Sequence, residues 1–139
     1  MEETSETHFL NVDLELRSDA ALAPLLQALQ GFAFALHQEV HWAVLELDTQ
    51  PATAEEAVLL FADAVASLPA SARALWYACR QRRLDIGILA GERPHSRDFV
   101  LSPAAVAALS EMAAELAITV YGSATSREKP RVPQTPPSR

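Results

Sequence analysis

The chain has 139 residues, half of them hydrophobic, which suits one domain with a sizeable core and excludes a disordered protein. Eighteen acidic against eleven basic residues give a net charge of −7, which disfavours duplex DNA, RNA and anionic membranes as partners. A single cysteine cannot form an internal disulfide. The acidic start lacks the pattern of a signal peptide and no apolar run is long enough to span a bilayer, so we expect a cytoplasmic protein.

The composition predicts three parts: a flexible N-terminus (residues 1–7), one α+β domain (residues 8–121) and a disordered, Pro-rich basic tail (residues 122–139). The tail contains four of the nine prolines and a net charge of +3, which leaves −10 for the rest of the chain. Such a segment cannot recover its ordering entropy by burial. The favoured interpretation is a solvating tail. The alternatives are contact with a nucleic acid or with its own acidic domain.

The first half of the domain is predicted to form a strand, a helix and two strands. From His8, polar and apolar residues alternate, and the expected inward side chains are Leu10, Val12, Leu14 and Leu16. This alternation sets Phe9, Asn11, Asp13 and Glu15 on the polar face. A short helix capped by Ser18 or Asp19 and closed by Gly31 follows, its apolar residues being Leu22, Leu25, Leu26 and Leu29. Residues 32–36 and 41–47 predict the next two strands.

The second half begins with a capping box at Thr53 and Glu56, which predicts a helix with an apolar stripe of Val58, Phe61, Val65 and Leu68. Pro69 begins or kinks a further helical stretch. We expect that stretch to end in cationic residues, where the helix dipole favours positive charge: Arg80, Arg82 and Arg83. Residues 84–90 predict a strand.

Residues 99–101 predict a short sixth strand, and Ser102 with Pro103 begins the last helix, which is followed by a closing strand over residues 116–121. The element order is therefore βαββαβ, the ferredoxin-like order, extended by a further βαβ. An α+β fold with a mostly antiparallel sheet and helices packed on one face is the predicted architecture.

Few residues have the spacing of a known catalytic or cofactor site. Four glycines cannot assemble a P-loop or a dinucleotide-binding motif, and no G-x-S-x-G sequence is present. His37, Glu39 and His41 are metal-ligand types, but in an extended chain the two histidines lie about 13 Å apart. A solvated hairpin tip is the favoured interpretation, and a metal site formed by a tight turn is the alternative. We predict no cofactor and no metal.

Other singled-out residues have structural interpretations. Cys79 is predicted to be a buried thiol, and Trp42 and Trp76 are predicted to lie in the core. Asp85 and Gly87 interrupt an apolar strand, which favours a sheet irregularity over a platform for a small ligand.

The locally basic part of the acidic domain is a candidate anion site. Residues 93–97 read as an ordinary polar hairpin, but they also place cation-capable groups in one loop near a sheet end. If the protein binds a small anion, the predicted ligand-binding residues are Arg80, Arg82, Arg83, Arg93, His95 and Arg97.

The chain resembles a family of small bacterial proteins. The residues that carry the likeness are Trp42–Leu47, the helix over residues 54–68, Leu84–Ile88, Leu101–Pro103 and Ala117–Tyr121. They are similar to the family known as domain of unknown function 4279, over residues 9–121. The resemblance implies a bacterial, cytoplasmic protein with no known reaction, some relatives of which act as accessory or immunity proteins.

The function predicted from these observations is a non-enzymatic protein-interaction module with an unknown protein partner. A protein that neutralises a basic toxin is one concrete version, because acidic surfaces steer association with basic proteins. The alternative is a sensor or enzyme for a small anion at the arginine and histidine residues named above. An unpaired edge at Phe99–Leu101 offers two alternatives: the edge is covered within the chain, or it pairs in a homodimer. Apolar side chains of the next helix would join the dimer contact, although burial against their own sheet explains them equally well: Val106, Leu109 and Met112.

Overall fold

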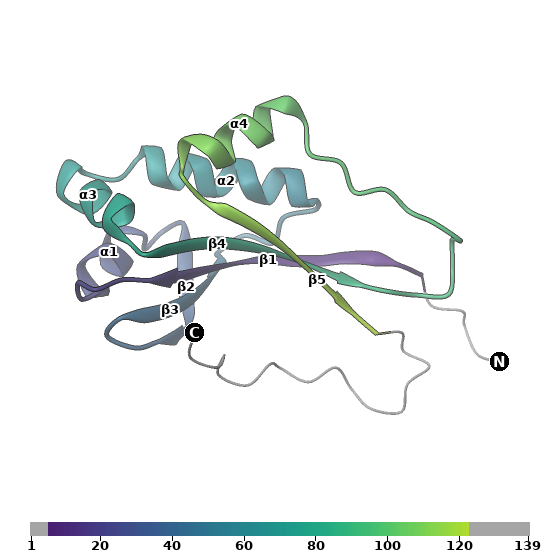
Figure 1. Ribbon diagram of the computed structural model, residues 1–139, viewed down its shortest axis with the longest axis horizontal. Helices are drawn as coiled ribbons and strands as arrows, with labels where there is room; N and C mark the ends of the chain where they lie inside the picture. Colours follow the sequence, from purple (N-terminus) through teal and green to yellow (C-terminus); the bar gives the residue numbers. More distant parts are fainter. Residues whose placement is uncertain (1–5, 123–139) are drawn as a thin grey trace.

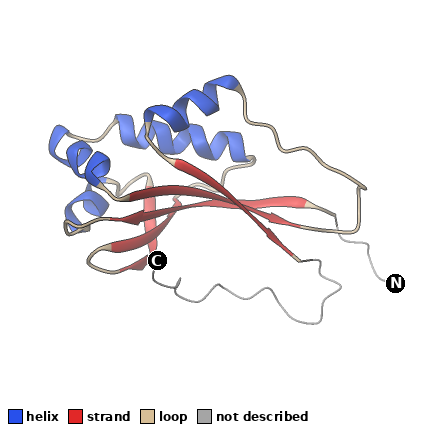
Figure 2. Cartoon of the chain, in the orientation of Figure 1, coloured by secondary structure: helices blue, strands red, loops and turns tan. Residues whose placement is uncertain are grey.

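A computed structural model describes residues 6–122, which form one five-stranded sheet with four helices on one side (Figures 1 and 2). The strands are β1 (His8–Arg17), β2 (Ala33–Gln38), β3 (Trp42–Leu47), β4 (Gln81–Leu89) and β5 (Glu115–Tyr121). The helices are α1 (Ala23–Ala28), α2 (Ala54–Ala66), α3 (Ala70–Ala78) and α4 (Pro103–Glu111). The predicted α+β class is confirmed. Within residues 6–122, no helix is long and apolar enough to cross a bilayer.

The strand order is β2-β3-β1-β4-β5. Strand β1 pairs antiparallel with both β3 and β4, β2 pairs antiparallel with β3, and β5 pairs parallel with β4. Each helical crossover in the first four strands therefore skips one strand, as in the predicted ferredoxin-like core. Helix α4 and β5 extend this core from β4.

The predicted sixth strand at Phe99–Leu101 is wrong, since these residues are irregular loop. β4 is already paired with β1 on one side and with β5 on the other, so the loop that leaves β4 finds no free edge of that strand. Phe99 and Leu101 instead pack against the core, while Val100 is 75% exposed.

The core lies between the sheet and the helices. Val12, Leu14 and Leu16 of β1 point into it as predicted and are each at most 1% exposed. The predicted stripe is buried along its whole length, with Val58, Phe61 and Val65 in α2 and Leu68 just beyond its end. Thr53 caps α2 by accepting a hydrogen bond from the Glu56 N–H, which confirms the predicted start of that helix.

A β-bulge in β1 changes the predicted face of Phe9. Phe9 pairs with Ile88 and Asn11 pairs with Gly87, so Leu10 is the extra residue. Phe9 consequently packs against the core instead of facing outward with Asn11. Gly87 fits this irregularity, because a Cβ atom there would lie 3.1 Å from Oδ1 of Asn11. The sheet irregularity expected at this glycine is found in the paired strand.

The first helix begins later than predicted. Its N-cap is Leu22, and the Ser18 hydroxyl instead accepts a hydrogen bond from the Ala20 N–H in the preceding turn. Gly31 follows the helix with φ +94°, a left-handed conformation that glycine adopts without strain. Ser102 caps α4 as predicted, through a hydrogen bond that its Oγ accepts from the Ala105 N–H.

Helix α3 ends at Ala78, so the prediction that it extends into the arginines is wrong. Arg82 and Arg83 belong to β4, which begins at Gln81. Arg82 nevertheless reaches back to the end of α3, where its Nη1 donates to the carbonyls of Trp76 and Cys79. Its Nε donates to the carbonyl of Ala113, just beyond α4, so this one guanidinium joins the carboxyl ends of two helices.

The ends of the predicted domain differ in what the structure describes. Glu6 and Thr7, assigned by composition to the flexible N-terminus, contact the loop after β4: the Thr7 N–H donates to the carbonyl of Arg93, and the Thr7 hydroxyl accepts from the Gly91 N–H. The predicted disordered tail lies outside the described residues apart from Gly122.

Candidate functional site

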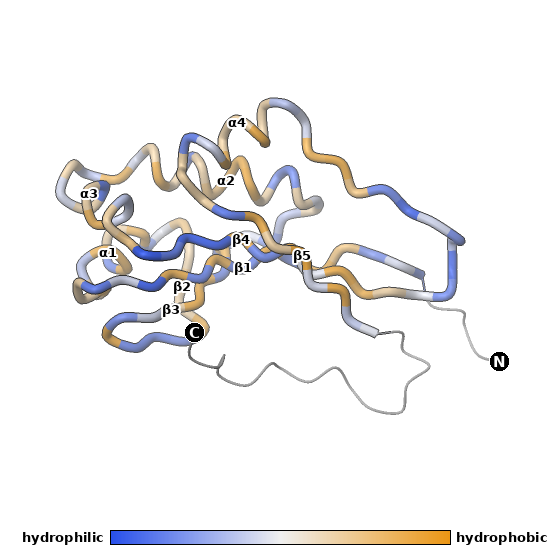
Figure 3. Tube along the Cα trace, viewed as in Figure 1, coloured by the Kyte–Doolittle hydropathy of each residue, from blue (hydrophilic) through white to orange (hydrophobic). Residues whose placement is uncertain are grey.

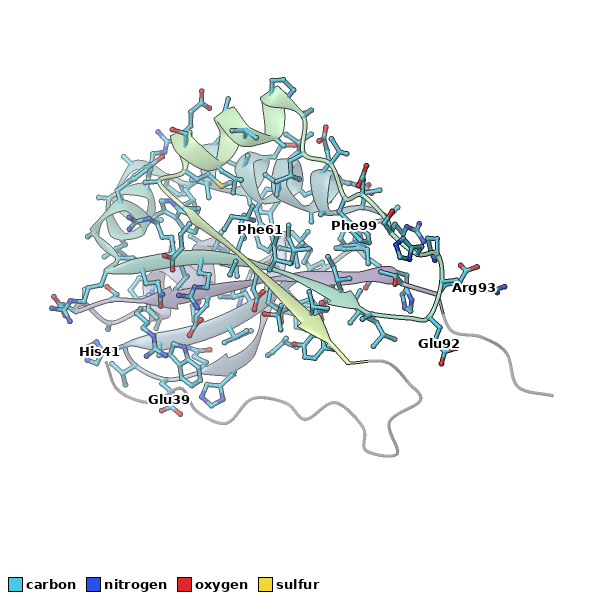
Figure 4. The ribbon with its side chains drawn as sticks, turned by 45° about the vertical axis from the view of Figure 1, so that its right-hand side comes forward. Glu39, His41, Phe61, Glu92, Arg93 and Phe99 are labelled. Atoms are coloured by element: carbon cyan, nitrogen blue, oxygen red, sulfur yellow. The ribbon has the colours of Figure 1, made fainter. Side chains whose placement is uncertain are left out.

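The six predicted anion-binding residues do not meet in one pocket. Arg80, Arg82 and Arg83 lie at the start of β4, and Arg93, His95 and Arg97 lie in the loop beyond its end. The last six residues of β4 (84–89) separate Arg83 from that loop, which corresponds to about 20 Å. Figure 4 shows Arg93 at the end of the molecule opposite the hairpin that contains Glu39 and His41.

The three arginines at the start of β4 are engaged in contacts within the chain. The Arg80 side chain pairs with Asp19 at 3.2 Å, and Arg83 Nε donates to Glu115 at 2.8 Å. That bond raises the pKa of Arg83 and lowers the pKa of Glu115. Arg82 is bound to helix carbonyls as described above. These contacts give the group a structural role.

In the loop after β4, Arg97 donates to the carbonyl of Thr7 and lies over the ring of Phe99, 5.7 Å from its centre. Arg93 and His95 are exposed. The loop is coloured as hydrophilic in Figure 3, in keeping with the ordinary polar loop predicted there.

The hairpin between β2 and β3 contains the histidines considered as metal ligands. His37 Nε2 lies 3.0 Å from Glu39 Oε2, and the His37 ring packs against Trp42 with their centres 4.5 Å apart. His41 instead contacts the carbonyl of Ala20 at 3.4 Å. In the described part of the chain, no three histidine, cysteine or acidic side chains are arranged to hold a metal ion.

A shallow groove lies between α1 and the edge strand β2. Its walls are mainly alanine, leucine and glutamine, and Asp48 is its one titratable residue. This lining offers hydrogen bonds and apolar contact but no pair of groups for acid–base chemistry.

Three acidic side chains lie side by side on the sheet face opposite the helices. On this face Asp13 of β1 stands directly between Glu46 of β3 and Asp85 of β4, because the strand register pairs it with both. We call these three residues the carboxylate row. All three are partly buried. The helices lie on the other side of the sheet, so the row faces away from them (Figure 1).

The carboxylate row is held by neutral hydrogen-bond donors. The Asn11 amide donates to Glu46 at 2.9 Å and to Asp13 at 3.4 Å. The Thr119 hydroxyl lies 2.8 and 3.0 Å from the two oxygens of Asp85. Among residues 6–122, no lysine, arginine or histidine forms an ion pair with any member of the row.

The crowding of negative charge alters the acidity of the site. Burial, Glu46 and Asp85 together raise the pKa of Asp13 from 3.8 to about 6. Burial and the charges of Asp85 and Asp13 also raise the pKa of Tyr121, whose side chain closes this part of the face near Gly87. The folded protein therefore carries an electrostatic cost at neutral pH that a positively charged partner would relieve.

Trp42 lies on the same open face, four residues along β3 from Glu46, rather than in the core, which corrects the prediction for that residue. Its Nε1 donates to Glu15 at 2.7 Å, and Arg17 lies over its ring at 5.1 Å. The register with β1 places Trp42 on the open face, where its indole N–H finds a carboxylate. Trp76 is fully buried and Cys79 is 5% exposed, so both of those predictions are confirmed, and burial raises the pKa of the Cys79 thiol.

We expect Asp13→Asn to stabilise the protein at pH 8 and to have no such effect at pH 4. The unfolded carboxyl titrates near 3.8 and the folded one near 6, so the wild type loses stability as pH rises through this interval. Allowing for solvent screening, the gain at pH 8 is about 1–2 kcal/mol. Urea unfolding of both proteins at the two pH values measures it. Equal differences at both pH values would contradict the electrostatic explanation.

No family model, curated protein or solved structure matches the chain. The resemblance to the domain of unknown function 4279 family stays a prediction. The carboxylate row was missed because its members are 33 and 39 residues apart in sequence, and only the strand register brings them together. The sequence did contain one indication of the row: each of its three acidic residues occupies an outward position of a predicted strand.

Proposed function

We propose that the protein is a non-enzymatic interaction module that binds a basic segment of a partner protein on its open sheet face, in a bacterial cytoplasm. The observation that carries this proposal is the carboxylate row, which has neutral hydrogen-bond donors and no ion-pair partner among the described residues. Arg83 interacts electrostatically with Asp85, but its guanidinium is bonded to Glu115. A lysine or arginine of a partner would supply the ion pair that the row lacks.

Binding of a cation at Asp13 has a favourable electrostatic component beyond the new contact itself. Like charges close together in a partly buried site repel one another, and a nearby positive charge reverses this effect. The negative charge of the whole domain adds long-range attraction for a basic protein and speeds its encounter. Affinity is therefore expected to fall with added salt.

The surroundings of the row suit a protein surface as the partner. Phe34 of β2 is 45% exposed on the same face, where its register partner is Glu46. Trp42 lies along the same face, and aromatic side chains beside charged groups are typical of protein interfaces. An immunity or accessory protein, as the family resemblance implies, would use such a face against a basic toxin.

The alternative function, a sensor or enzyme for a small anion, required six converging cationic side chains. Their separation into two groups gives that alternative no supporting observation.

Affinity capture with charge variants tests the proposal. The double variant Glu46→Gln/Asp85→Asn removes two charges from the face, and Asp63→Asn/Glu111→Gln removes two from exposed helix positions as the matched control. We expect wild type and control to capture the same basic protein from the native host, and the face variant to lose at least about tenfold in affinity.

Capture should also weaken between about 50 mM and 500 mM salt. A captured partner bound equally by wild type and the face variant would overturn the assignment of the face. Turnover of a small molecule by the purified protein would overturn the non-enzymatic proposal.

A further inference from the structure

Strand β5 exposes an apolar stripe on the helix side of the sheet. Leu116, Ile118 and Val120 are 38%, 59% and 60% exposed, although their register partners on β4 are buried. Helix α4 packs against α2 rather than over β5, and Leu109 of α4 and its C-cap Met112 are buried. Within residues 6–122, no helix therefore covers the outer part of β5. The stripe lies along the front strand of Figure 1, and hydrophobic colour marks the middle of β5 in Figure 3.

The free backbone groups of β5 belong to the same three residues. The Tyr121 carbonyl accepts from the Ala90 N–H at 2.9 Å, so Tyr121 directs its backbone groups toward the β4 side. The side to which a residue directs its backbone N–H and C=O groups alternates along a strand. The residues that direct these groups to the open edge are therefore Leu116, Ile118 and Val120. Apolar side chains and unpaired backbone groups thus coincide.

The two edges of the sheet differ in how they resist pairing. β2, the other edge, has a bulge between Ala35 and His37, and bulges disrupt regular pairing with another chain. β5 runs in continuous register with β4 over seven residues and contains no proline, lysine or arginine. Within residues 6–122, β5 is therefore the sheet edge that lacks these protective features.

We propose that a second copy of this chain covers β5 by antiparallel pairing of the two β5 strands, with Ile118 on the two-fold axis. This proposal is independent of the function proposed for the opposite face. An isologous contact makes each edge complete the other. Leu116 then faces Val120 of the partner subunit, and the three outward residues of each chain exchange about six backbone hydrogen bonds.

This register also keeps the negative charges of the two β5 strands apart. Glu115 is the one charged residue of β5, and the pairing sets it opposite Tyr121 of the partner subunit, at the far end from the partner's Glu115. Its carboxylate keeps its bonds to Arg83 and Gln81 in its own chain. The two sheets would join into one of ten strands with a continuous apolar stripe across the junction.

Sedimentation velocity of the full chain at concentrations from about 5 to 500 µM tests the proposal. We expect twice the 15.1 kDa monomer mass at the upper concentrations. Ile118→Lys should remain at the monomer mass throughout, because it places a charge at the axis of an exposed stripe. Val100→Lys, at another exposed apolar position, is the matched control and should behave as wild type.

Cross-linking tests the register. Ile118→Cys should form a disulfide-linked dimer on mild oxidation, since residues on the axis face each other about 5.5 Å apart between Cα atoms. Val106→Cys, exposed on α4, should not. A dimer that Ile118→Lys leaves intact, or a wild type that stays monomeric at every concentration, would overturn the proposal. If the wild type is monomeric but the backbone amide of Ile118 exchanges slowly with solvent, the dimer proposal is wrong and residues 123–139 are the segment that covers this edge.

Discussion

Replacing Trp76 with alanine is expected to lower the free energy of unfolding by about 3–5 kcal/mol. Trp76 is the largest fully buried side chain of the described residues, and it reaches from α3 to the end of α4. Its Nε1 donates to the carbonyl of Met112 at 2.9 Å, so the change leaves both a cavity and an unpaired carbonyl. Urea unfolding followed by circular dichroism measures the loss.

Tyr77→Ala is the matched control, since the neighbouring Tyr77 is 46% exposed on the same helix and likewise bonds the end of α4, through an exposed hydrogen bond from its hydroxyl to the Glu111 carbonyl. Its loss should stay below about 1 kcal/mol. Trp76→Phe separates the two causes: it keeps most of the buried area and removes the hydrogen bond, for an expected loss of about 1–2 kcal/mol. Equal losses for Trp76→Ala and Tyr77→Ala would contradict the packing described for α3.

The second large effect is expected for Arg82→Met, about 2 kcal/mol of destabilisation. Methionine preserves much of the aliphatic stem but donates no hydrogen bond to the carbonyls of Trp76, Cys79 and Ala113. Ala113 is the critical acceptor because it has φ +54°, an unfavourable conformation for alanine. Without Arg82 the left-handed turn after α4 loses one of its restraints.

Arg80→Met serves as the control, because the Arg80 side chain is 72% exposed in its ion pair with Asp19. It should change the unfolding free energy by no more than about 0.5 kcal/mol. Thermal unfolding of both variants would show the contrast. If Arg82→Met lowered the unfolding free energy no more than the control does, we would conclude that water satisfies the three carbonyls as well as Arg82 does.

The sequence patterns predicted the fold class and most elements, because each rests on local periodicity. The alternation in β1 and the stripe of α2 are readable from a few adjacent residues. The errors arose where the outcome depends on pairing. Phe9 faces the core because of a bulge at Leu10, and residues 99–101 form no strand because both sides of β4 are occupied.

The candidate site was less predictable for the same reason. The arginines were predicted to form an anion site because they are close together in sequence. In the structure, however, those at the start of β4 and those in the next loop lie at opposite ends of the sheet. The members of the carboxylate row are isolated acids in sequence, each ordinary in its own strand. Their effect on one another depends on lateral distance, which only strand order and register determine.

The central position of β1 has a consequence for synthesis of the chain. The first strand made is the middle strand of the sheet, and both of its partners come later: β3 from residue 42 and β4 from residue 81. At about 5–20 residues per second, β4 is made roughly 3–15 s after β1. During that time Val12, Leu14 and Leu16 have no complete sheet to join, so their burial is completed only after β4 has been made.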